Sequence, residues 1–166
     1  MRKLVKKSIL AGSLVLGGCA AMMRTAPMPG DTRDAVTTKF GPPTAVYQEA
    51  GGQVLEYASG PFGHETYMAH LGPDGRLTLF EQVLTGQKFA TLKIGSVTRD
   101  DVLRTLGRPS ERSYLDLPEL EVWSYRYKEN GVWNSMMHAH FDRAGVLRMM
   151  QNGPDRMFEE KSFFRD

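Results

Sequence analysis

The sequence predicts an α+β fold in which a unit of helix and antiparallel strands occurs twice. A motif of Thr-Arg-Asp, then Gly, then Pro begins at Thr32 and again at Thr98, a spacing of 66 residues. In each copy, apolar residues three to four positions apart predict a helix. Alternating apolar and polar residues between turn residues predict the strands that follow it. Because the helix precedes its strands as a separate group, the class is α+β.

Residues 1–18 predict a signal peptide. Four basic residues precede a short apolar run, and small residues follow the run, which is the layout of an export signal. The apolar run covers 14 residues, 8–21, whereas a membrane-spanning helix needs roughly 18 or more. A permanent transmembrane anchor is therefore the weaker interpretation.

Cys19 is expected to carry a lipid. The segment Leu16-Gly17-Gly18-Cys19 resembles the bacterial lipobox, in which the cysteine thiol is diacylated and the chain is then cut just before it. We therefore expect cleavage between Gly18 and Cys19. This cysteine is the only one in the chain, so it has no partner for an internal disulfide. An ordinary signal peptide with a chance cysteine is the alternative.

The residues after the cleavage point indicate where the protein lies. Ala20 follows the cysteine where an aspartate would favour the inner membrane, so we expect an outer-membrane anchor facing the periplasm. Residues 19–29 are expected to form a tether. Removing 1–18 leaves 17 basic and 19 acidic residues, a net charge of −2. The basic balance of the whole chain therefore gives no support for nucleic-acid binding.

Each copy is expected to contain one or two helices packed on a three-stranded antiparallel sheet. Thr32 and Thr98 are suited to begin the helices, and Gly41 and Gly107 to end them. The predicted strands are 53–59, 65–71 and 77–83 in the first copy and 121–128, 135–141 and 146–151 in the second. One such unit buries little core alone, so the two copies, 30–92 and 93–154, are expected to pack together.

The second copy resembles the SmpA/OmlA (BamE-like) domain of outer-membrane lipoproteins. The resemblance rests on IGSVT at 94–98, LGRP at 106–109, WSY at 123–125 and FDRAGVL at 141–147. The first copy departs from the pattern by losing one residue after Gly30 and by having Leu71-Gly72 in place of Phe-Asp. The two-copy arrangement is also similar to the secreted β-lactamase inhibitor proteins, in which two such units form a concave binding surface.

These resemblances imply a binding function without catalysis. Members of the BamE-like family are accessory lipoproteins of the machine that inserts β-barrels into the outer membrane. The resemblance to them therefore implies a protein-binding module for outer-membrane protein assembly or envelope integrity. The inhibitor likeness implies an alternative, an inhibitor of a periplasmic or secreted hydrolase. The implied partners are the membrane, through the lipid on Cys19, and an envelope protein; no cofactor and no catalytic residue are implied.

The histidines and a few neighbours form the candidate partner surface. His138 and His140 are two residues apart on a predicted strand, so their side chains share a face, and His70 holds the matching position in the first copy. Two histidines without a nearby acidic or cysteine ligand are a weak metal motif, so a metal-binding envelope protein is the third hypothesis and no metal ligand is assigned. The candidate partner surface consists of Phe62, His70, Arg126, Lys128, His138 and His140.

The remaining motifs do not predict an enzyme. Cys19 is committed to lipid, and no Gly-x-Ser-x-Gly turn is present. Trp123, Tyr125 and Tyr127 share a strand face and are suited to stack on a sugar, but their spacing favours a core position. The C-terminal tail, 155–166, carries three phenylalanines, so it is expected either to fold back as a short helix or to dock on a partner.

Overall fold

The computed structural model of the protein describes residues 26–158. The predicted signal peptide, Cys19 and most of the C-terminal tail lie outside the described residues. Inside them, no helix is long and apolar enough to cross a membrane. The fold is a mixed α+β structure with two four-stranded antiparallel sheets, which confirms the predicted class.

The first unit, residues 32–82, is a helix followed by four strands. It contains α1 (Arg33–Phe40), β1 (Ala45–Glu49), β2 (Gly52–Ala58), β3 (Thr66–Leu71) and β4 (Leu77–Gln82). The strands are hydrogen-bonded in the order β1-β2-β3-β4, and every pair is antiparallel. Each strand therefore pairs only with its neighbours in the chain.

The second unit, residues 98–154, has the same order of elements. It contains α3 (Arg99–Leu106), β5 (Glu111–Leu115), β6 (Leu120–Glu129), β7 (Trp133–Phe141) and β8 (Leu147–Pro154). The single-turn helix α2 (Gly86–Phe89) lies between the units, and the 3-10 turn η1 (Arg156–Phe158) follows β8. The two units also share irregular features: isolated bridges join Thr32 to Arg76 and Thr98 to Val146.

Both predicted pairs of helix caps are confirmed. Thr32 and Thr98 each accept a hydrogen bond from the backbone N–H three residues later, at 3.2 and 3.3 Å. The carboxylate of Asp101 also accepts the N–H of Thr98 at 2.9 Å, so α3 begins with a reciprocal capping box. Gly41 and Gly107 end the helices with φ angles of +95° and +79°, which a residue with a side chain rarely adopts.

The prediction of three strands per sheet is wrong, because each sheet has a fourth strand at its edge. β1 and β5 are five residues long and pair with one neighbour only. All five residues of β5 and three of the five in β1 are exposed. Without a buried face, neither segment shows the apolar alternation by which a strand is recognised in a sequence.

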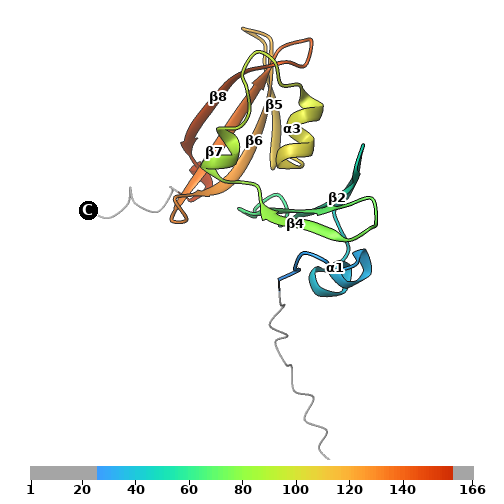
Figure 1. Cartoon of the computed structure of the whole chain (residues 1–166). Coiled ribbons are helices and arrows are strands. Elements are labelled where there is room, and N and C mark those ends of the chain that lie inside the picture. Colours follow the sequence, from blue (N-terminus) through green and yellow to red (C-terminus); the bar gives the residue numbers. More distant parts are fainter. Residues whose placement is uncertain (1–25, 159–166) are drawn as a thin grey trace, which may run out of the picture.

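α1 packs on one face of the first sheet, on the side away from the second unit (Figure 1). Val36 is fully buried against Leu55, Ala69 and Leu77. Phe40 adds three aromatic contacts, with the rings of Tyr57, Tyr67 and Phe80 at centroid distances of 5.3, 5.3 and 4.9 Å. We call the face of a sheet that packs on the helix of its own unit the helix face, and the opposite side the second face.

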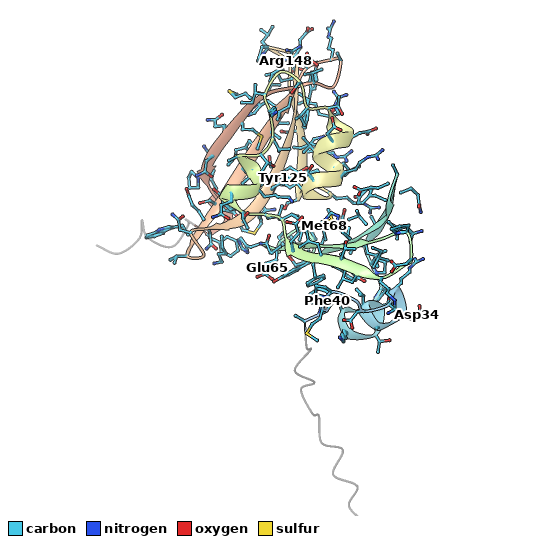
Figure 2. The ribbon with its side chains drawn as sticks, in the orientation of Figure 1. Asp34, Phe40, Glu65, Met68, Tyr125 and Arg148 are labelled. Atoms are coloured by element: carbon cyan, nitrogen blue, oxygen red, sulfur yellow. The ribbon has the colours of Figure 1, made fainter. Side chains whose placement is uncertain are left out.

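α3 lies between the two sheets and packs on both (Figure 1). Its Val102 and Leu106 are fully buried in one cluster with Met68 of the first sheet and Tyr125 of the second. Figure 2 shows Phe40 on the α1 side of the first sheet and Met68 on the other. The second face of the first sheet is therefore covered by the second unit.

A buried carboxylate joins the two units where α3 ends. Glu56 is fully buried on β2 and accepts hydrogen bonds from the Thr44 hydroxyl at 3.0 Å, the Tyr47 hydroxyl and the backbone N–H of Arg108 at 3.2 Å. Gly107 passes so close that a Cβ there would lie 3.0 Å from the Glu56 carboxylate. The absence of a side chain at Gly107 therefore allows the units to come together.

Candidate functional site

The second face of the second sheet contains most of the predicted partner residues. Alternate residues of β6 and β7 form its centre, with Val122 opposite His140 and Ser124 opposite His138. The other face of β6 carries Trp123, Tyr125 and Tyr127, which are all buried in the cluster around α3. The predicted core position of these three aromatic residues is confirmed.

The predicted shared face of His138 and His140 is also confirmed. His138 Nδ1 lies 2.8 Å from the hydroxyl oxygen of Ser124. His140 is buried, and neither of its ring nitrogens has a hydrogen-bond partner among the described residues. Burial lowers the pKa of both histidines, and for His140 the neighbouring His138 lowers the pKa further. Both rings are therefore held in the neutral form near pH 7.

Arg126 connects segments of its own chain and is not free for a partner. Its side chain is 4% exposed. Its guanidinium donates to the Asp155 carboxylate at 3.0 Å, to the Pro61 carbonyl at 2.7 Å and to the Glu111 carboxylate. These contacts attach the loop after β2 and the start of the C-terminal tail to one end of the second face.

Phe62 lies on a loop beside this face, His70 lies on the other sheet, and Lys128 lies near the end of β6. Phe62 is exposed at 65% on the loop beside Arg126, whose guanidinium carbon is 6.0 Å from the ring centroid. Lys128 is exposed and donates to Asn134 at 2.6 Å. His70 lies on the second face of the first sheet, 3.3 Å from the Glu81 carboxylate. The structure therefore does not bring the six predicted residues to one continuous surface.

The metal hypothesis gains no ligand set from this geometry. Among residues 26–158, no group of three or more His, Cys, Asp or Glu side chains is arranged to hold a metal ion. His70 belongs to the other sheet and is paired with Glu81. Two histidines on one strand face, one of them bonded to a serine, remain a weak metal motif.

The end of the second face away from Arg126 is open and apolar. Leu115 on β5 and Met149 on β8, each 40% exposed, flank buried Val122 and His140 on this face. Within the part of the chain that the structure describes, α2 and α3 pack on the opposite face, through Phe89 and Val102. We call Leu115, Val122, His140 and Met149 the open end. Sequence patterns did not single out Leu115 and Met149, because β5 was not predicted as a strand and β8 alternates weakly.

Comparisons with known proteins do not assign a family. No protein-family model matches the chain, and no curated protein matches it. Among solved structures, the chain is similar to a DUF4309 family protein (YjgB) from Bacillus subtilis, with 14% identity over 75% of this chain and 78% of that chain. The TM-score is 0.33, a value at which the likeness carries no argument about fold or function.

Proposed function

We propose that this chain is a lipid-anchored, non-catalytic protein-binding module of the bacterial outer membrane, built from two BamE-like repeats. The second face of the second sheet is its docking surface for an envelope protein. The observation that carries the proposal is a difference between equivalent faces. On the first sheet this face is covered by α3. On the second sheet α2 and α3 pack on the other face, and the equivalent face carries exposed Leu115 and Met149 at its open end.

The open end has the composition of a small binding surface. Leu115 and Met149 present exposed apolar side chains at the edges, and the centre of the face is already shielded from water. A partner that covers such a surface gains free energy mainly from apolar burial. The contact between α3 and the first sheet indicates the kind of element that fits, a short helix with two or three aliphatic side chains on one side. A role in outer-membrane protein assembly or envelope integrity follows from the family resemblance.

Site-specific photocrosslinking in intact cells tests the docking surface. A crosslinking amino acid at Leu115 or Met149 is expected to capture one envelope protein, and Val122→Asp is expected to abolish the capture. The matched control position is Thr78, an exposed residue of β4, where no adduct is expected. The same adduct from all three positions, or none from Leu115 and Met149, contradicts the proposed surface.

The anchor has a separate test, because Cys19 lies outside the described residues. Labelled palmitate is expected to be incorporated into the protein and to be lost in the Cys19→Ser variant, which should also leave the membrane fraction. Incorporation that survives the substitution would contradict the lipid assignment.

Phe62 supports a second candidate function, the inhibition of a hydrolase. An exposed aromatic ring on a loop that Arg126 fixes in place is suited to enter a pocket of an enzyme. Excess protein is then expected to inhibit a member of a panel of periplasmic and secreted hydrolases, with inhibition lost in Phe62→Ala. Unchanged activity across the panel counts against this candidate.

A further inference from the structure

A groove at the end of the second sheet remains outside the docking surface. It lies where β7 begins and β8 ends, with a volume of about 540 Å³, within the range of about 300–1,000 Å³ typical of ligand sites. Two aromatic residues, Trp133 and Phe158, line it and are called its walls; three of its polar lining residues, Glu129, Ser135 and Asn152, are called its floor. Aromatic walls and a polar floor together indicate a ligand with both apolar and polar sides.

The two aromatic walls are exposed to solvent. Trp133 is 68% exposed and Phe158 is 49% exposed. Phe158 is fixed by a backbone hydrogen bond to Asp155 at 2.9 Å and by its contact with the His64 ring, 5.2 Å between centroids. Large aromatic side chains left in water beside a groove are more informative than scattered surface apolar residues.

The polar floor is a connected network. The two carboxylate oxygens of Glu129 accept hydrogen bonds from the Ser135 hydroxyl at 2.8 Å and the Asn152 amide at 2.9 Å. Asn152 accepts in turn from the Tyr127 hydroxyl at 2.9 Å. The hydrogen bonds from Asn152 and Ser135 lower the pKa of Glu129, so the carboxylate is ionised near neutral pH. Each group is held in one orientation yet keeps lone pairs or an N–H for a ligand.

We propose that this groove binds a neutral saccharide. A pyranose ring has an apolar C–H face that stacks on an aromatic ring and a rim of hydroxyls that both donate and accept hydrogen bonds. Trp133 supplies the stacking surface, while the Glu129 carboxylate accepts from hydroxyls and the Asn152 amide and Ser135 hydroxyl complete the polar contacts. The inference is independent of the docking surface, because none of these residues belongs to the open end.

The charge of the floor decides against other ligands. A phosphate or an anionic lipid headgroup would be repelled by the ionised Glu129. A protein partner that covered the groove would have to desolvate the ionised Glu129 and its hydrogen-bonded neighbours, which costs free energy unless each group is paired. A quaternary ammonium ion fits the charge, but it gives the hydroxyl and amide groups of the floor nothing to bind. A neutral polyol can use the carboxylate, the amide, the hydroxyl and the indole ring together.

The chain's two tryptophans make a direct NMR test available. Their indole N–H signals report separately on Trp133 in the groove and Trp123 in the core. The protein is titrated with chitotriose, cellotriose and maltotriose at millimolar concentrations. We expect at least one of these sugars to shift the Trp133 signal saturably while the Trp123 signal stays in place.

Matched variants connect that shift to the groove. Trp133→Ala is expected to abolish binding, and Asn152→Ala to weaken it about tenfold, the effect of losing one hydrogen bond to a ligand. Val132→Ala changes a neighbouring exposed residue outside the groove lining and should bind normally. Circular dichroism of each variant establishes that it is folded.

Three outcomes overturn the saccharide assignment. The first is that no trisaccharide moves the Trp133 signal. The second is that folded Trp133→Ala binds as well as the unmodified protein. The third is that tetramethylammonium moves the Trp133 signal and the sugars do not, which assigns the groove to a cation instead.

Discussion

Arg126 holds three distant segments of the chain in one place. Its buried guanidinium bonds Asp155, Pro61 and Glu111, and Asp155 is itself only 1% exposed. Replacing Arg126 with alanine leaves the Asp155 carboxylate buried without its cation. We expect Arg126→Ala to lower the free energy of unfolding by about 3–5 kcal/mol, the usual cost of breaking one side of a buried ion pair.

Denaturant unfolding at neutral pH measures this loss. Lys128→Ala removes another cation of the same strand at an exposed position, so it is expected to change stability by less than about 0.5 kcal/mol. Equal effects of the two substitutions would show that the buried contacts of Arg126 contribute nothing specific.

Three histidines give stability a pH dependence of known sign. Burial is the main cause that lowers the pKa of His64, His138 and His140 from the ordinary 6.5. As the pH falls below about 6.5, the unfolded chain takes up protons before the folded protein does. The contribution of the neutral histidines to the free energy of unfolding is therefore fully present above this pH. It decreases as the pH falls and levels off below the lowered pKa values.

Unfolding measured between about pH 8 and pH 5 is expected to show this decrease, because ordinary carboxylates titrate mostly below that window. A double variant, His138→Gln with His140→Gln, should have a flatter profile than the unmodified protein. A profile that keeps its slope in the variant would assign the pH dependence to other groups.

At the level of single residues, the sequence predicts what depends on neighbours along the chain. The helix caps and the shared face of the two histidines follow from spacing of four residues or fewer, and the structure confirms both. The sequence places Arg126 on an open strand face, whereas the structure buries it under the loop at Pro61 and Asp155. These residues are 65 and 29 positions away in the chain. Trp133 was not singled out, although a large aromatic residue soon after the Asn130-Gly131 turn is the signal that was available.

Equivalent glycines at the ends of α1 and α3 allow a matched test of how the units join. Gly41 has no atom within 4 Å of an added Cβ, whereas at Gly107 a Cβ would lie 3.0 Å from both Glu56 and Thr66. Both φ angles are positive, so alanine at either position costs about 1–3 kcal/mol in backbone strain. Gly107→Ala is expected to cost more, because it also forces α3 away from the first sheet.

The difference in unfolding free energy between Gly107→Ala and Gly41→Ala measures that additional cost. Equal losses would mean that the structure accommodates a Cβ at Gly107 without further loss of stability. A larger loss at Gly41 would place the more demanding contact in the first unit.

Elements are predictable where one of their faces is buried. The six strands with a buried residue pattern were predicted within a few residues of their observed ends, whereas the edge strands β1 and β5 were not. The two helices differ informatively. Leu103 of α3 packs into the cluster between the sheets, while its counterpart in α1, Thr37, is polar. The apolar residue in α3 is consistent with its contact with two sheets, and the polar residue in α1 is consistent with contact with only one.

For the whole molecule, the shared core predicts that both units unfold together. Met68 of the first unit and Leu106 of the second lie in one buried cluster, so neither unit keeps its core without the other. Both tryptophans lie in the second unit, so fluorescence follows that unit while circular dichroism follows both. We expect the two transitions to coincide.

Met68→Ala sharpens this test, because the residue is fully buried on the first sheet. It is expected to lower stability by about 2–5 kcal/mol and to move both transitions equally. A fluorescence midpoint that stays in place, with a two-step change in circular dichroism, would show that the units are independent.

The sequence predicts less about the arrangement of the two units than about single residues and elements. The duplicated pattern indicates two similar units that pack together, and the fold agrees with that arrangement at the level of α+β units. The pattern does not specify that α3 is placed between the sheets, since the apolar residues of α3 are compatible with packing on either one. That choice depends on contacts across more than 30 residues, such as Arg108 with Glu56.

The position of α3 between the sheets means that further copies of the unit could be added only at the second sheet. The second unit covers the sheet of the first and leaves the open end of its own sheet exposed, as in linear arrays that need a distinct terminal cap. A third copy fused after the second would cover Leu115 and Met149 and present an equivalent surface of its own. By duplication alone, the sheet of the last copy is therefore left without a following helix.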